Sequence, residues 1–175
     1  MRLHITIIMG LILLLTVFSG CSPIFKAIRD GDVKRVEGLL ESGSSADTRQ
    51  CCGWTPLHEA AELGNTEIAE LLIKFQASVN SRDDNYRTPL HIATIHGNLS
   101  IVNVLMNNAS DINARDEWGQ TPLHLAVINN QPQIVEILIE YKALCSIKDI
   151  DGKSPYDLAM EQGNAEISEM LKNCM

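Results

Sequence analysis

Apolar residues recur along the chain in two short helical runs within each unit of 33 residues. A hydroxyl residue followed by proline comes before the first run of every unit, at Ser22, Thr55, Thr88, Thr121 and Ser154. A hydroxyl suits the N-cap and proline suits the first turn, so each pair predicts the start of a helix. Nine residues after the hydroxyl stands a glycine or, once, Asn130, which predicts a left-handed end to that helix.

A second apolar stripe follows in the inner units, as at Ile68, Leu72 and Ile73, and predicts a second helix with one buried face. Beyond it the chain becomes extended and polar, and Gly53, Gly119 or Gly152 two residues before the next hydroxyl predicts a tight turn. Helix, turn, helix and β-hairpin would then repeat as one unit. The pattern predicts an open all-α solenoid whose function lies on its surface.

Thr-Pro-Leu-His, a glycine, an isoleucine, paired leucines and Asn-Ala-x-Asp at fixed offsets resemble the ankyrin repeat from Ser22 to Met175. The resemblance implies a domain over 21–175 with about five repeats including the caps. Their expected bounds are about 22–49 for the N-terminal cap, 50–82, 83–115, 116–148, and 149–175 for the C-terminal cap.

The chain departs from the ankyrin pattern in two ways. The end units carry Phe25 and Asp157 where the inner units have histidine, as expected for caps. Glycines of the family pattern are replaced at Tyr86, Gln76, Ala109 and Lys142. Each replacement costs about 0.5–1 kcal/mol if the left-handed backbone is kept.

Residues 1–20 have the parts of a secretory signal peptide, with Arg2, an uncharged apolar run over 5–18, and small residues before Cys21. The alternative is a membrane span, but the run of fourteen residues is shorter than the about 20 that a spanning helix needs. Phe18-Ser19-Gly20-Cys21 also resembles a bacterial lipobox, which implies a lipid anchor on Cys21. Ordinary cleavage, leaving a free thiol or a soluble protein, is the competing interpretation.

The net charge of the chain excludes some classes of binding partner. The net charge of −8 becomes −9 without residues 1–20, which hold Arg2 and no acidic residue. Nucleic acid needs a basic face, so we expect no nucleic-acid partner and no polybasic membrane contact. The sequence has no glycine-rich phosphate loop or nucleophile elbow. We therefore expect no catalysis, no small-molecule substrate and no cofactor.

His58, His91 and His124 recur at one offset. Stacked units lie about 10 Å apart, too far for one shared zinc ion, so we expect no metal site and instead bonds to the N-cap hydroxyl and backbone.

Three cysteines of the repeat region call for separate predictions. Cys145 takes an apolar position of its repeat and is expected to be a buried thiol. Cys51 and Cys52 fall on a hairpin tip. They are either a redox pair, for example a strained vicinal disulfide, or surface residues without a role.

In the ankyrin family, partners bind a concave face made by the hairpin tips and first helices, which implies a protein partner here. Transferred by offset, the partner-binding candidates are Trp54, Leu63, Arg82, Arg87, Ile95, Arg115, Trp118, Gln120 and Ile128. Trp and Arg are common interface anchors, and the three aliphatic residues would form an apolar row. Alternatively the tryptophans pack on the next hairpin, and Arg82 and Arg115 pair with neighbouring aspartates.

Two functions are consistent with these features. The first is a non-catalytic adaptor, exported to the cell envelope, held at a membrane on its periplasmic or surface face by a lipid on Cys21, and binding a protein. The alternative is a secreted ankyrin effector that acts on host proteins.

Overall fold

The computed structural model describes residues 22–174, and within them the chain forms ten α-helices and one short 3-10 turn. The elements are α2 (Pro23–Arg29), α3 (Val33–Glu41), η1 (Cys51–Gly53), α4 (Pro56–Leu63), α5 (Thr66–Lys74), α6 (Pro89–Ile95), α7 (Leu99–Asn107), α8 (Pro122–Ile128), α9 (Pro132–Glu140), α10 (Pro155–Glu161) and α11 (Ala165–Lys172).

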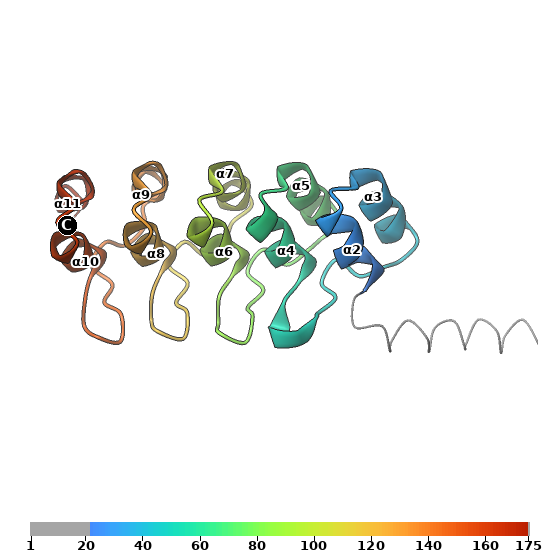
Figure 1. Cartoon of the computed structure of the whole chain (residues 1–175), viewed down its shortest axis with the longest axis horizontal. Coiled ribbons are helices and arrows are strands. Elements are labelled where there is room, and N and C mark those ends of the chain that lie inside the picture. The colour runs from blue at the N-terminus through green and yellow to red at the C-terminus, as the bar shows by residue number, and fades with distance from the viewer. Residues whose placement is uncertain (1–21, 175) are drawn as a thin grey trace, which may run out of the picture.

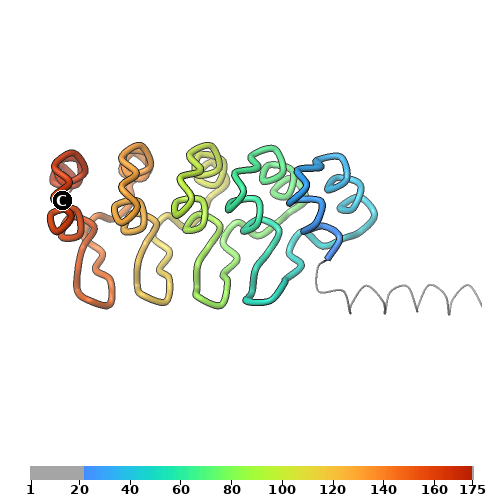
Figure 2. The backbone as a smooth tube through the Cα atoms, in the orientation of Figure 1, coloured from blue at the N-terminus to red at the C-terminus, as the bar shows by residue number. Residues whose placement is uncertain are grey.

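The helices stack as five pairs in a row (Figure 1). The first helices, α2, α4, α6, α8 and α10, form one layer, and the second helices form the other. Long loops project from the edge of the first layer, all on one side, as the backbone tube shows (Figure 2). The predicted open solenoid is confirmed.

Each first helix of the inner units begins and ends where the sequence predicts. Thr88 has an extended backbone, Pro89 opens α6, and the side chains of Thr88 and His91 cap each other's backbone N–H groups. The helix pairs then turn through a left-handed residue, which is Gly64 (φ 76°) after α4 and Asn130 (φ 52°) after α8. Asn130 therefore takes the conformation that its place in the repeat requires.

A continuous core lies between the two layers. Leu57, Leu90 and Leu123 of the first helices are fully buried. Ile68 and Ile101 of the second helices expose at most 1% of their surface. No pair has enough apolar surface to fold alone, because each of these side chains is covered partly by the neighbouring pair. The stability of the fold therefore depends on contacts between adjacent repeats.

The projecting loops differ from the prediction, because no residue of 22–174 is in a β-strand. In the second loop the backbone N–H of Asp83 donates to Arg87 O at 2.9 Å, and Asp83 Oδ1 accepts from the N–H groups of Asn85 and Arg87. The aspartate side chain satisfies donors that a strand ladder would otherwise pair. The predicted β-hairpins are thus carboxylate-closed loops, called hairpin loops below.

Non-glycine residues do keep the left-handed backbone at the ends of the second helices. Gln76, Ala109 and Lys142 have φ values of 64°, 59° and 67°, and Tyr86 has φ 60° in its hairpin loop. Each side chain is therefore held in a conformation that glycine adopts more easily.

The substitution Lys142→Gly is expected to raise the free energy of unfolding by about 0.5–1 kcal/mol, because it relieves the left-handed backbone. Glu140→Gly, two residues earlier at the last residue of α9, is the matched control and should lower the free energy of unfolding by up to about 1 kcal/mol. Urea unfolding measures both changes. Equal destabilisation by both substitutions would contradict the assigned strain.

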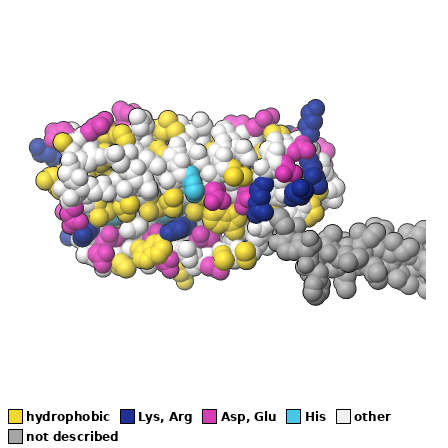
Figure 3. All heavy atoms as spheres, in the orientation of Figure 1, with side chains coloured by type: hydrophobic (Ala, Val, Ile, Leu, Met, Phe, Trp, Pro, Cys, Tyr) yellow, Lys and Arg dark blue, Asp and Glu magenta, His cyan; other side chains and the backbone are white. Residues whose placement is uncertain are grey.

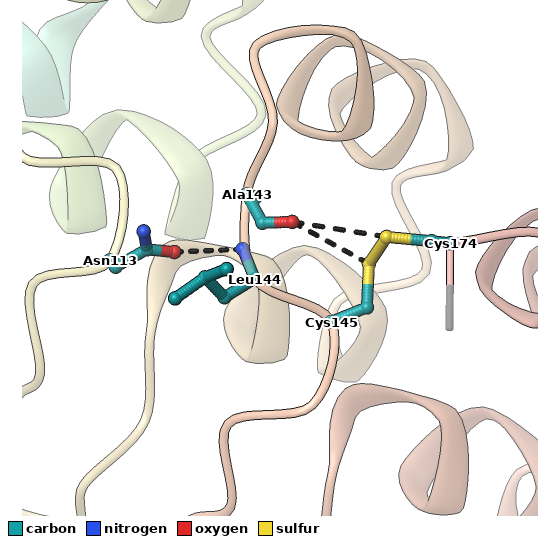
Figure 4. Close-up of a disulfide and its surroundings, with 5 residues drawn as sticks. All are labelled: Asn113, Ala143, Leu144, Cys145 and Cys174. Carbon is teal, nitrogen blue, oxygen red and sulfur yellow. Dashed lines mark hydrogen bonds between the residues drawn. A yellow bond between two sulfur atoms is a disulfide. The ribbon is translucent and has the colours of Figure 1, made fainter.

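The C-terminal cap is joined to the fourth repeat by a disulfide between Cys145 and Cys174 (Figure 4). The prediction of a free buried thiol at Cys145 is wrong, although that residue is indeed buried, with 3% of its surface exposed. The Cα atoms lie 6.1 Å apart, within the ordinary range for a disulfide. Leu144 N also donates to Asn113 Oδ1 at 2.9 Å, which ties the same loop to the preceding repeat.

Cys174→Ser is expected to lower the free energy of unfolding by about 2–4 kcal/mol, because the disulfide closes a loop with a sequence separation of 29. Denaturant unfolding of the variant and of the wild type, each with and without reductant, measures this loss. The reductant should lower the free energy of unfolding of the wild type to that of the variant, and it should not change the free energy of unfolding of the variant. A reductant effect of the same size in the variant would contradict the assignment.

Candidate functional site

Buried histidines link the repeats rather than bind a ligand. In α6 the backbone N–H of Thr88 lies 3.1 Å from His91 Nδ1 and Thr88 Oγ1 lies 2.9 Å from it. A nitrogen that accepts an N–H bond carries no proton, so the proton is on Nε2. His91 Nε2 then donates to Gln120 O of the next hairpin loop at 3.3 Å.

The other two units repeat this arrangement. His58 Nε2 donates to Arg87 O at 3.0 Å and His124 Nε2 donates to Lys153 O at 3.2 Å. In the last unit Asp157 replaces the histidine and bonds Ser154 only, since no further loop follows it in the described chain. The predicted structural role of the three histidines is confirmed, because their bonds satisfy both ring nitrogens.

Burial gives these histidines an unusual titration. Desolvation lowers the pKa of His91 to about 4, although its bond to Gln120 O opposes that shift. Desolvation also lowers the pKa of His58 and of His124. The neutral imidazole is therefore the form that the folded chain favours.

Three arginines recur at one offset of the hairpin loops, Arg49, Arg82 and Arg115, and we call them the basic column. They donate to backbone carbonyls and not to carboxylates. Arg49 donates to Arg82 O at 2.9 Å, Arg82 to Arg115 O at 3.2 Å, and Arg115 to Lys148 O at 2.8 Å. The expected pairing with aspartates is thus replaced by a guanidinium-to-carbonyl bond between successive loops. Arg82 and Arg115 remain exposed. Their binding role stays a prediction beside this structural one.

Trp54 is held inside its own repeat. Its indole N–H donates to Glu59 Oε2 at 2.8 Å, and its ring lies 5.1 Å from that of His58. Glu59 is only 5% exposed and its other oxygen accepts from Arg29 of the first repeat. Arg29 therefore compensates a buried carboxylate. No local sequence pattern indicates this trio, because its members come from different elements.

Trp118 lies at a loop tip and is 39% exposed. The guanidinium of Arg87 sits over its ring at 4.8 Å from the centroid. Arg87 Nε also lies 3.9 Å from Asp116 Oδ2, and neither atom has a hydrogen-bond partner. Burial raises the pKa of Asp116. We call Arg87 and Trp118 the tip pair.

Gln120, the next candidate, uses its backbone for the bonds to Asp116 and His91.

The apolar row is interrupted. Ile95 and Ile128 share one offset in α6 and α8, but Glu62 holds that offset in α4 and Leu63 lies one residue later. One residue rotates a side chain by about 100° around a helix. Leu63 is 46% exposed and Ile128 38% exposed, whereas Ile95 packs partly on the core. Ile128 also lines an open surface hollow of about 510 Å³ beside the turn from α10 to α11.

Hydrophobic side chains lie among charged ones on the loop side of the molecule (Figure 3). An apolar surface with a charged rim is typical of a contact site. Trp118, Arg87, Ile95 and Ile128 come from hairpin loops and first helices that stack side by side. Of the nine candidates, the structure brings Arg87 and Trp118 into contact and gives Trp54 an internal role.

Cys51 and Cys52 are free and exposed in η1, so the vicinal disulfide is not formed. The predicted signal peptide at 1–20 and the predicted lipidation site Cys21 lie outside the described residues. Within 22–174 no helix is both long and apolar enough to span a bilayer. The same residues contain no group of three or more His, Cys, Asp or Glu side chains arranged for a metal ion.

Comparison with known protein families gives two matches, one to ankyrin repeats in three copies over residues 24–116 and one to ankyrin repeats in many copies over 107–159. The first match alone spans more than half of the 175 residues. The chain belongs to the ankyrin repeat family. In a comparison with curated proteins, none matches this ankyrin repeat chain. Ankyrin repeats are typically non-catalytic modules that bind other proteins, so this family assigns the chain a protein partner.

The buried histidines make the ankyrin repeats sensitive to acid. A folded pKa below the unfolded value of about 6.5 means that the unfolded chain binds more protons, so stability falls as pH falls from 6.5 toward 4. For His91 the full loss is about 3 kcal/mol. Denaturant unfolding at pH 7 and pH 4.5 checks this expectation.

The variant His91→Gln distinguishes the contribution of His91 to the pH dependence of stability from that of other titrating groups. This variant is less stable at pH 7, but its stability should decline less between pH 7 and pH 4.5 than that of the wild type. An identical decline in both proteins would show that His91 does not cause the acid sensitivity.

Proposed function

We propose that this ankyrin repeat chain is a non-catalytic adaptor of the cell envelope, exported by residues 1–20 and held at a membrane by a lipid on Cys21. It binds a protein partner through the face that carries the tip pair, Ile95 and Ile128. Among the structural observations, the one that carries the binding proposal is the exposed Trp118 ring with the Arg87 guanidinium stacked on it.

The tip pair has the properties of an interface anchor. Trp118 offers a large ring that is fixed by Arg87, so little side-chain entropy is lost when a partner covers it. Trp and Arg also dominate measured binding hot spots. Ile95 and Ile128 add apolar surface on adjacent helices, and the open hollow beside Ile128 can receive a partner side chain.

Two observations support export. The signal-like residues 1–20 precede the repeats directly, and the Cys145–Cys174 disulfide fits an oxidising compartment, where such bonds persist. The lipid anchor is supported by the lipobox-like Phe18-Ser19-Gly20-Cys21 alone. More than one acyl chain is needed for stable anchoring, and lipoprotein maturation supplies at least two.

Metabolic labelling with a palmitate analogue tests the anchor. The wild type should carry the label and fractionate with membranes, whereas Cys21→Ala should carry no label. Wild-type protein that is unlabelled and found in the medium would overturn the anchor and favour the secreted effector.

Affinity capture from an envelope extract, followed by a binding measurement with the partner so identified, tests the face. Trp118→Ala is expected to weaken binding by about 2 kcal/mol or more, which is about 30-fold, because it removes the central ring. Tyr141→Ala is the matched control, because Tyr141 is also 39% exposed but follows the second helix α9. Equal affinities of the Trp118→Ala variant and the wild type would show that the interface lies on another part of the surface.

A further inference from the structure

The tips of the hairpin loops form one bonded row along the side of the solenoid (Figure 2). A backbone N–H of each tip donates to a carbonyl oxygen of the tip before it. Because these bonds link neighbouring repeats, the side chains of the tips keep a fixed order. We call residues 51–52, 84–85, 117–118 and 150–151 the tip edge. The three bonds run from Asp84 N to Cys52 O at 2.9 Å, from Glu117 N to Asn85 O at 2.9 Å, and from Ile150 N to Trp118 O at 3.0 Å.

The tip edge carries an apolar centre that extends the tip pair. Ile150 is 66% exposed, the largest value for a large hydrophobic side chain in residues 22–174. Its backbone N–H is bonded to Trp118, and its Cγ2 atom lies 3.4 Å from the position that a Cβ atom on Gly119 would take. Ile150 therefore lies against the loop that holds the exposed Trp118 ring. Neighbouring apolar side chains that water reaches form a surface that a partner can cover.

Acidic side chains flank this apolar centre. Asp84, Glu117 and Asp151 are exposed on three successive tips, and we call them the tip carboxylates. Within residues 22–174 none of the three forms an ion pair. Hydrophobic and acidic side chains lie next to one another along the loop edge (Figure 3). The tip carboxylates are therefore free to pair with a cation from outside the chain.

The cations beside the tip edge are mostly engaged within the chain. Arg87 Nε lies 3.9 Å from Asp116 Oδ2, and Asp116 is 6% exposed, so the guanidinium compensates this buried carboxylate. Lys153 Nζ lies 2.6 Å from Glu161 Oε2. The basic column donates to backbone carbonyls, and Lys148, at the same offset of the last loop, is exposed. The charge that the tip edge offers to a partner is thus mainly negative.

We propose that the tip edge binds a basic and apolar segment of the protein partner. Apolar side chains of that segment cover Trp118 and Ile150, and its lysine or arginine side chains pair with the tip carboxylates. This inference rests on the proposed function and specifies the chemistry of its partner. Burial of the apolar centre supplies affinity, and opposite charge determines which segment binds. An acidic segment is rejected, because like charges would face each other across the contact.

A synthetic peptide that repeats Lys-Val-Ser four times is the probe for this proposal. Stacked repeats lie about 10 Å apart and an extended chain advances about 3.3 Å per residue, so every third residue can reach the next tip. The full chain in a neutral detergent should bind this lysine peptide about 100-fold more tightly than a peptide that repeats Glu-Val-Ser. Raising NaCl from about 50 to about 500 mM should weaken binding about tenfold. Fluorescence anisotropy of the labelled peptides measures both effects.

Two variants separate the contributions of charge and of the apolar centre. The triple variant Asp84→Asn, Glu117→Gln and Asp151→Asn should weaken binding of the lysine peptide about tenfold and remove most of its salt dependence. Ile150→Ser should weaken binding about tenfold at either salt concentration, because it removes apolar surface from the contact.

Two substitutions outside the tip edge are the matched controls. Glu140→Gln removes an exposed carboxylate at the last residue of α9, and Leu144→Ser removes an apolar side chain that is 54% exposed. Each should change the Kd of the lysine peptide by less than about twofold. All of the substituted residues are exposed, so circular dichroism should show an unchanged fold.

Equal affinity for the lysine and glutamate peptides would overturn the proposal. Wild-type binding of the lysine peptide by both the triple variant and Ile150→Ser would overturn it as well, and so would a dimer of the chain that covers the tip edge and excludes the peptide. The first two results concern only the chemistry of the partner. The measurement with Trp118→Ala and the natural partner decides separately whether the proposed face is used.

Discussion

The hydrogen bond from a buried histidine to a backbone carbonyl of the next repeat is the constraint on which the rest of the structure depends. His58, His91 and His124 each join the start of a first helix to the following hairpin loop. The imidazole is neutral and its two nitrogens have fixed roles, so the bond sets the register between repeats. The chain of such bonds ends at Asp157, which bonds its own N-cap.

That register decides which polar groups are free to meet a partner. The arginines of the basic column bond the next loop, and Glu59 is compensated by Trp54 and Arg29. Trp118 remains partly exposed: its loop closes through Asp116, and the Arg87 guanidinium lies over its ring. The proposed contact face therefore consists of what the stacking of repeats leaves uncovered.

The cysteines show how backbone geometry selects their chemistry. Cys145 and Cys174 come from elements that lie next to each other only after the last two helices have docked, and they are joined. Cys51 and Cys52 are neighbours in sequence, and both are free and exposed. One pair stabilises the C-terminal cap, and the other stays exposed at the opposite half of the solenoid (Figure 1).

The sequence by itself determined the repeat, the helix starts, the left-handed turn at Asn130 and the structural role of the histidines. These features depend on residues close in sequence or separated by one constant period, so a pattern records them. Only the tertiary structure decided the Cys145–Cys174 disulfide, the trio around Glu59, the one-residue offset of Leu63 and the carbonyl partners of the arginines. These depend on side-chain directions and on contacts between elements, which no local propensity encodes.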